Sequence, residues 1–130
     1  MRGGAQTIEI YERIDIVGHV RRMAPIFDMR LKALADHPLV GDARGVGLLG
    51  GLELVKDKRA KQSFEPKLGV GAKAARFAEE EGVLSRAVGG DNLGLCPPLV
   101  IDGAEINTMF DGIARALDRT EMWARKEGHF

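Results

Sequence analysis

The chain has 130 residues, of which 45% are hydrophobic and 29% charged, and its 19 acidic side chains balance its 19 basic ones. This length favours a single domain with a modest core, and the lack of net positive charge argues against nucleic acid or an anionic membrane as a partner. The single Cys96 cannot form an internal disulfide, and no apolar run approaches the roughly 20 residues of a membrane helix, so we expect a cytoplasmic setting.

The first part of the chain is predicted to be helical. Ile8 to Arg13 are typical of the last turns of a helix, and Asp15 is expected to cap a second helix that runs to about Ala35. The apolar stripe of this second helix recurs at three- and four-residue spacing and comprises Val17, Val20, Ala24, Phe27, Leu31 and Leu34. Pro25 predicts a local bend, and His37-Pro38 predicts the end of the helix.

A glycine-rich segment follows from Val40 to Val55, and its two ends alternate as strands do. The glycines in its middle indicate a sharp turn, a bulge or a close approach to another surface, so two short strands and one bent strand are both possible. The sequence GVGLLG at positions 45–50 matches the dinucleotide fingerprint G-x-G-x-x-G. That fingerprint needs a helix after its last glycine to hold a pyrophosphate. The strand-like Leu52 to Val55 comes next instead, so we interpret the match as a structural strand–turn–strand.

The next segment is predicted to form a helix and a hairpin. A helix from about Gly69 to Glu81 precedes Gly82, which stands where a left-handed C-terminal cap is usual. Strands are expected over Val83 to Val88 and Asn92 to Cys96, and the Gly89-Gly90-Asp91 between them favours a tight turn.

The last helix begins with a capping box, in which Asp102 is followed three residues later by Glu105. Its apolar stripe comprises Ile106, Met109, Phe110, Ile113 and Leu117. The tail from Arg125 to Phe130 is expected to fray. The order α-α-β(β)-α-β-β-α predicts an α/β (α+β) fold, in which helices cover one face of a small, mainly antiparallel sheet of three to four strands.

Arg86 is the strongest candidate for a binding residue. It is expected at the end of a short apolar strand, beside two glycines that would allow its loop to move. A planar guanidinium can bind a carboxylate bidentately, although an arginine at a strand end more often forms a surface ion pair that contributes little.

The other reactive side chains are not expected to form a site. The three histidines, His19, His37 and His129, are too widely spaced to indicate a metal centre. Ser85 lacks the sequence context of a hydrolase nucleophile, and Cys96 is expected to be buried and inert.

Several ordered segments resemble the C-terminal domain of class III aminotransferases, the ω-amino-acid:pyruvate group of pyridoxal-phosphate (PLP) enzymes, and the likeness extends from about Ile8 to Leu117. The sequence RGVGLL at 44–49 is similar to the family's R-G-x-G-L/F segment, GLELVKDK at 51–58 to the following strand and D-K loop, and KQSF at 61–64 to K-x-x-F. The sequence GVLSR at 82–86 resembles the G-L-I-x-R strand. CPPLVI at 96–101, with Glu105-Ile106, resembles the P-P-L/F-I-I/L-T-E-x-E-I/M stretch.

This resemblance implies that residues 1–15 are the remnant of a connecting helix and that residues 16–130 form the small domain of a fold type I enzyme. It also implies that Arg86 receives the substrate carboxylate, while an amino group passes from an ω-amino acid or amine to a pyruvate-like keto acid. In the family the PLP-binding lysine belongs to the large domain. Lysines 56, 58, 61, 67 and 73 are predicted in polar loops or on helix faces, without the buried setting that such a lysine needs.

We therefore expect no PLP on this chain and no catalysis by it alone, and we expect a partner in the large PLP-binding domain or its chain. The surface that this domain should cover predicts self-association. An alternative from another class is a non-catalytic oligomerisation or partner-binding module that reuses the same domain.

Overall fold

The computed structural model describes residues 15–60 and 62–130. It contains α2 (Ile16–Ala33), β1 (Val40–Val46), β2 (Leu49–Leu54), α3 (Val70–Glu80), β3 (Arg86–Val88), β4 (Asn92–Leu95) and α4 (Gly103–Lys126), with short 3-10 turns at Leu34–Asp36 and Pro66–Leu68. The helix predicted over Ile8 to Arg13 lies outside the described residues. The order of the remaining elements agrees with the predicted order, and the glycine-rich segment forms two strands instead of one bent strand.

The four strands form one antiparallel sheet with the order β1-β2-β4-β3. Two hairpins build it. The first turns at Gly47, which has a φ of 60°, and the second turns at Gly89 and Gly90, which have φ values of 55° and 95°. A left-handed backbone favours glycine at these positions, as the sequence predicts. The hairpins meet where β2 pairs with β4, and α3 connects them.

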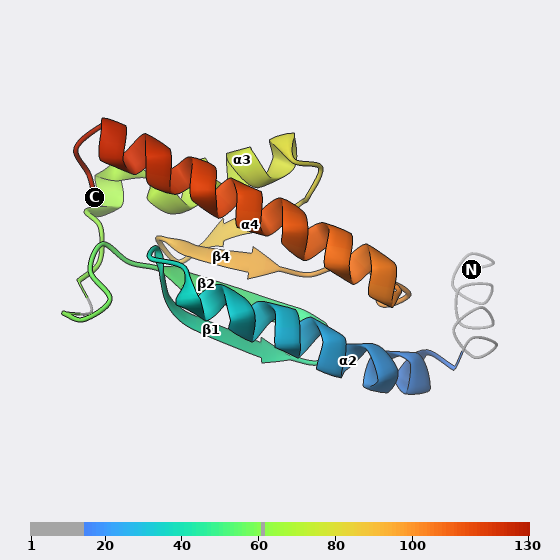
Figure 1. Ribbon diagram of the computed structural model, residues 1–130. Helices are drawn as coiled ribbons and strands as arrows, with labels where there is room; N and C mark the ends of the chain where they lie inside the picture. The colour runs from blue at the N-terminus through green and yellow to red at the C-terminus, as the bar shows by residue number, and fades with distance from the viewer. Residues whose placement is uncertain (1–14, 61) are drawn as a thin grey trace, which may run out of the picture.

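Helices cover one face of this sheet, as Figure 1 shows. Helix α2 packs along β1 and against α4, and α3 packs against β3 and α4. The strand side chains that are buried beneath the helices include Ala43, Leu52, Leu54, Leu93 and Leu95. They meet an edge-to-face pair of rings, Phe27 of α2 and Phe110 of α4, whose centroids are 5.0 Å apart. The predicted α+β architecture with a single covered face is therefore confirmed.

The helix ends follow the sequence signals. The Asp15 side chain accepts a hydrogen bond from the Gly18 backbone at the start of α2. Asp102 and Glu105 form the predicted capping box at the start of α4, and Gly82 has the left-handed φ of 84° expected after α3. Pro25 lies inside α2, and the bend expected there stays a prediction. No helix in residues 15–60 and 62–130 has the length and apolar character needed to cross a membrane.

Four local expectations are wrong. Val17 is 60% exposed, Val20 is only partly buried, and the first fully buried residue of α2 is Phe27. The strand expected from Val83 begins only at Arg86, because the Val83 N–H instead donates to the Ala78 carbonyl and closes the end of α3. The tail does not fray after Arg125, since α4 continues to Lys126 and the Phe130 ring packs against Phe64.

The fourth concerns Cys96, which is exposed. The reason is the alternation along β4, where Leu93 and Leu95 are buried against the helices. A residue one step beyond Leu95 points away from that core.

Candidate functional site

Arg86 lies on the face of the sheet that the helices leave open. Its Cα pairs with Gly94, and the next pair in the register joins Ala87 to the buried Leu93. Side chains alternate between the two faces along a strand, so Arg86 lies opposite to the helix-covered side. It is exposed. Its position at the start of β3, rather than at the end of a longer strand, corrects the sequence expectation.

Arg86 carries an unpaired charge within residues 15–60 and 62–130, where the ion pairs all involve other residues. The surface ion pair that would make this arginine structural is therefore not formed in the described part of the chain. An unpaired guanidinium retains all its donors for an anion, and a carboxylate matches its planar geometry.

A pocket of about 580 Å³ surrounds Arg86, with apolar side chains on its walls. Leu49 and Val88 approach it from the open face, and Leu84 enters from the loop before β3. The Ser85 side chain also lines the pocket, and its buried hydroxyl oxygen has no hydrogen-bond partner. Apolar walls around one cation are typical of a site that orients a small organic acid by its charged end.

A larger apolar groove of about 990 Å³ continues from this pocket. Leu84 and Cys96 line both hollows. Leu84 is 85% exposed, and Leu99, which also lines the groove, is 45% exposed. Contiguous apolar surface of this kind marks a place where another molecule binds.

The sequence analysis did not single out Arg44 as a site residue, but the register places it in one cross-strand row with Arg86. Arg44 pairs with Gly51, Gly51 with Gly94, and Gly94 with Arg86. Both arginines therefore lie on the open face. The strand order β1-β2-β4-β3 creates this row, and only the R-G-x-G resemblance pointed to Arg44 beforehand.

Unlike Arg86, Arg44 is already paired. Its guanidinium contacts the carboxylates of Asp42 and Glu53. The hydrogen bond from Arg44 holds the pKa of Asp42 below its ordinary value and raises the pKa of the Arg44 guanidinium in turn. Arg44 is thus less available to a ligand than Arg86.

The segment 45–50 comprises the last two residues of β1, the turn at positions 47–48 and the first two residues of β2, which continues to Leu54. The predicted strand after the last glycine is confirmed. The segment therefore lacks the helix N-terminus that a pyrophosphate would need, and the absence of dinucleotide binding stays a prediction.

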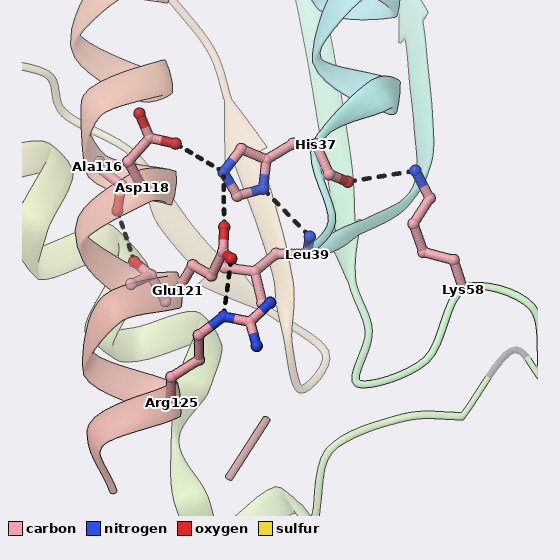
Figure 2. A network of polar contacts seen from close by, with 8 residues as sticks. His37, Leu39, Lys58, Ala116, Asp118, Glu121 and Arg125 are labelled. Carbon is pink, nitrogen blue, oxygen red and sulfur yellow. Dashed lines mark hydrogen bonds and ion pairs between the residues drawn. The ribbon is translucent and has the colours of Figure 1, made fainter. Parts of the chain in front are cut away.

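A second polar cluster involves His37, which the sequence analysis had set aside because the histidines are far apart. The fold brings His37 to Asp118 and Glu121 of α4, and one ligand atom from each lies within 4.8 Å of the others (Figure 2). The His37 Nε2 atom lies 2.9 Å from Asp118 Oδ1 and 3.8 Å from Glu121 Oε1. The sequence alone shows that Asp118 and Glu121 are three residues apart on one helix. It does not show that His37 lies beside them, because His37 is 81 residues from Asp118.

Hydrogen bonding defines the chemistry of this cluster. The Leu39 backbone N–H donates to His37 Nδ1 over 3.1 Å. In neutral imidazole the proton then resides on Nε2, which donates it to Asp118. A metal ion would need the Nε2 lone pair and hence a proton on Nδ1, facing the Leu39 N–H. We interpret the cluster as a connection between the end of α2 and α4, strengthened by Arg125, which donates to Glu121 over 2.9 Å (Figure 2).

The lysines do not offer a setting for PLP in the described residues, where none is buried. Lys67 is exposed and pairs with Glu65, and Lys58 donates to the backbone carbonyls of Ala35 and His37. Lys73 is half-buried, with its ammonium 4.9 Å from the Phe77 ring centroid. A charged ammonium in these surroundings lacks the desolvation that makes a lysine nucleophilic. The residues described here do not fit covalent attachment of PLP.

Comparison with known proteins places this geometry in one family. The family model for aminotransferase class-III matches residues 3–117. Gamma aminobutyrate transaminase 3, chloroplastic, of Solanum lycopersicum is 38% identical over 89% of this chain and 22% of its own length. The putrescine–pyruvate aminotransferase of Pseudomonas aeruginosa is 40% identical over 88% of this chain and 25% of its own length. The chain thus spans about a quarter of the length of these relatives.

Solved structures agree with this assignment. A PLP-bound aminotransferase mutant from Vibrio fluvialis superposes with a TM-score of 0.78 at 36% identity, over 82% of this chain and 24% of the other. The sequence matches and the structural match each cover most of this chain. Each covers about a quarter of the longer transaminase. The chain belongs to the class III aminotransferase family.

Proposed function

We propose that this chain acts as the small C-terminal domain of a PLP-dependent class III aminotransferase, with residues 16–130 as that domain and residues 1–15 as part of a connecting helix. In this role it contributes Arg86, which receives the carboxylate of the substrate, and it is not catalytic alone. The intact enzyme transfers an amino group from an ω-amino acid or amine to a pyruvate-like keto acid. PLP supplies the amino-transfer chemistry, and it binds to the large domain rather than to this chain.

One observation carries the proposal. Arg86 is an exposed cation with no acidic partner in the described residues, it lies among apolar walls, and it ends the GVLSR segment that resembles the family's G-L-I-x-R strand. An unpaired arginine beside exposed Leu84 and Val88 has no evident role in the stability of this chain. It is suited to binding an anion that arrives from outside.

The role of Arg86 follows from its chemistry. Its guanidinium donates two parallel hydrogen bonds to a carboxylate and fixes the orientation of the remainder of the substrate. In this chain Arg86 is exposed, so water screens its attraction to a carboxylate, and the pairing becomes stronger only where the large domain closes the pocket. For an amine without a carboxylate the guanidinium has no partner, so the side chain must remain in solvent or turn away. Gly89 and Gly90, with their left-handed backbone, adjoin the strand that carries Arg86.

The test uses a hybrid enzyme in which this chain replaces the matching region of the Pseudomonas aeruginosa putrescine–pyruvate aminotransferase. Arg86→Ala and Arg86→Lys should lower kcat/KM for keto acids and α-amino acids. The expected decrease corresponds to a loss of about 1.5–3 kcal/mol of transition-state stabilisation, the contribution of a hydrogen bond to a charged group. Amines without a carboxylate should react almost as before. Equal losses for both substrate classes would show that Arg86 is structural and that the assignment is wrong.

Arg76→Ala provides the matched control. Arg76 is exposed on α3 and does not line the pocket, and its replacement removes the same single positive charge as Arg86→Ala. This variant should leave both substrate classes unaffected. If it reproduced the Arg86 pattern, the effect would come from the overall charge and not from a carboxylate contact.

The second candidate is the non-catalytic partner-binding module, which the exposed apolar groove beside Arg86 also favours. The two candidates differ in the Arg86 experiment, since a partner-binding module gives no substrate-dependent result. Both predict self-association of the isolated chain through apolar surface, which sedimentation measurements would detect as a concentration-dependent rise in mass.

A further inference from the structure

His37 connects the start of β1 to helix α4, and Figure 2 shows its contacts. Its side chain is only 12% exposed. The Nδ1 atom accepts a hydrogen bond from the Leu39 backbone N–H over 3.1 Å, and Nε2 lies 2.9 Å from Asp118 Oδ1. The His37 carbonyl also accepts from the backbone N–H of Val40 over 3.0 Å. A single residue thus joins the first residues of an edge strand to the C-terminal helix.

Both ring nitrogens of His37 are in use while the ring is neutral. A backbone N–H can only donate, so Nδ1 offers its lone pair to Leu39 and the ring proton resides on Nε2. A second proton can be added only at Nδ1. Two N–H groups would then face each other across the same 3.1 Å, and the hydrogen bond to Leu39 would be lost. The bond to Asp118 would persist, because Nε2 keeps its proton.

The charged groups that face His37 keep a protonated ring on the α4 side. Asp118 and Glu121 of α4 present carboxylate oxygens 2.9 Å and 3.8 Å from Nε2, and Arg125 pairs with Glu121 over 2.9 Å. From the loop after β2, the Lys58 ammonium approaches the His37 backbone, 3.2 Å from its carbonyl oxygen. An imidazolium is attracted by the two carboxylates, so the charged ring stays with α4 when it loses Leu39.

His19 provides a comparison within the same protein. Its Nε2 atom lies 2.7 Å from the Ile101 carbonyl oxygen. A carbonyl oxygen can only accept, so the neutral ring of His19 also carries its proton on Nε2. Protonation of His19 leaves this bond intact, whereas protonation of His37 removes the bond to Leu39. The two histidines therefore differ in what a second proton does to the fold around them.

We propose that His37 is a proton-operated link between β1 and α4. The neutral ring joins the Leu39 N–H to Asp118, and the protonated ring remains with the α4 carboxylates and releases the Leu39 N–H. Leu39 is fully buried, and its carbonyl accepts the Val55 N–H over 2.8 Å. Release at this point therefore loosens the start of the edge strand β1. This inference goes beyond the proposed function and does not depend on Arg86 or on PLP.

Amide hydrogen exchange of the full 130-residue chain, followed by NMR, tests the proposal. The range is about pH 8 to about pH 5, in which histidine changes charge. After correction for the intrinsic exchange rate, the protection of the Leu39 amide should fall by about threefold to tenfold as His37 becomes protonated, the effect of losing one hydrogen bond. The Val83 amide, which donates to the Ala78 carbonyl at the end of α3, is the reference for pH effects on the whole fold.

His37→Asn supplies the matched variant. An asparagine side-chain oxygen can accept the N–H two residues further on, and it takes up no proton in this range. The protection of the Leu39 amide should then be equal at both ends of the pH range. His19→Gln is the control, since it removes a titrating ring of the same tautomer away from Leu39. This variant should retain the pH-dependent loss at Leu39.

The 15N chemical shifts of the His37 ring report its protonation directly. In the neutral protein they should show a proton on Nε2 and none on Nδ1, and a proton on Nδ1 would overturn the proposal. Constant protection of Leu39 while His37 becomes protonated would also refute it, as would a ring that stays neutral throughout the range. A loss of protection that persists in His37→Asn would assign the effect to another group.

If His37→Asn does not fold, Asp118→Asn replaces it. With one carboxylate fewer beside the ring, the loss of Leu39 protection should occur at a lower pH than in the unaltered chain. An unchanged pH of this loss would contradict the role of the α4 carboxylates. These readouts omit substrate and PLP, so they remain valid if the carboxylate role of Arg86 fails.

Discussion

The two faces of the sheet differ in what the chain itself provides to cover them. On the helix face, Leu52 and Leu93 are fully buried. A Cβ added to Gly45 would lie 2.6 Å from Leu31, and one added to Gly50 would lie 3.1 Å from the Phe27 ring. On the open face, Leu49 and Val46 are exposed, and within the described residues a Cβ added to Gly51 would contact nothing within 4 Å. The helix face is explained by the stability of this chain, and the open face is not.

The features that internal packing leaves unexplained are the ones that indicate function in a chain that spans about a quarter of its relatives' length. A residue that is needed for the packing of this chain is explained by the stability of the fold. Its presence therefore does not indicate a partner. The features left over are Arg86, which has no ion pair within residues 15–60 and 62–130, an exposed Leu84 and the glycine pair Gly51 and Gly94, and all lie on the open face or in the adjoining pocket.

The largest expected difference in the free energy of unfolding is between two leucine-to-alanine substitutions, one on each face of β2. Leu52→Ala removes a fully buried side chain and should lower the free energy of unfolding by about 2–5 kcal/mol. Leu49→Ala in the same strand removes an exposed side chain and should change it by less than about 0.5 kcal/mol. Urea denaturation of the isolated chain measures both values. Similar losses for the two variants would mean that the open face is already covered, for example by a second copy.

The sequence predicts the helix face well because its signals are local. Apolar spacing places Phe27 and Phe110 in the core, and the glycine pair at Gly89-Gly90 predicts the hairpin. The capping residues Asp102 and Glu105 lie three positions apart and form the expected box. Each of these features depends on residues within one turn or one hairpin of each other, so the sequence contains the information.

The open face could not be predicted in the same way, because it depends on contacts between distant segments. The row that joins Arg44 to Arg86 requires the pairing of β2 with β4. The approach of His37 to Asp118 requires α4 to pack beside the end of α2. The start of β3 at Arg86 depends on Val83, whose N–H bonds to Ala78 of α3 and not to β4. In each case a tertiary contact decides between two locally acceptable conformations.

A smaller effect is expected at the cap of α4, within the helix layer. Asp102→Ala removes the side chain that accepts from the Glu105 N–H over 2.7 Å and should lower the free energy of unfolding by about 1 kcal/mol. Asp28→Ala makes the same chemical change at an exposed position inside α2, where alanine is a better helix former, and it should be neutral or stabilising. Thermal unfolding by circular dichroism compares the two. An equal decrease in Tm would show that charge, and not capping, is responsible.

The smallest effect is a pH dependence that again separates the helix layer from the open face. Glu81 follows α3 and accepts a hydrogen bond from Arg115 of α4 over 2.8 Å, and this bond holds the pKa of Glu81 below its ordinary value of 4.5. Asp42 on the open face also has a pKa below its ordinary value of 3.8, because of the hydrogen bond from Arg44. A carboxyl group whose pKa is lower in the folded protein stabilises the fold above its unfolded pKa, and this stabilisation is lost as the pH falls through the folded value.

The two carboxyl groups should nevertheless differ in how much each contributes. Glu81 and Arg115 are 34 residues apart and separate on unfolding, whereas Asp42 and Arg44 are two residues apart and remain close in the unfolded chain. Glu81→Gln should therefore reduce the loss of stability between about pH 6 and about pH 3 more than Asp42→Asn does. Urea midpoints across this range, measured in low salt, test the difference. A larger effect from Asp42→Asn would indicate that the open-face carboxylate is held by contacts beyond its own strand, as expected if a partner already covers that face.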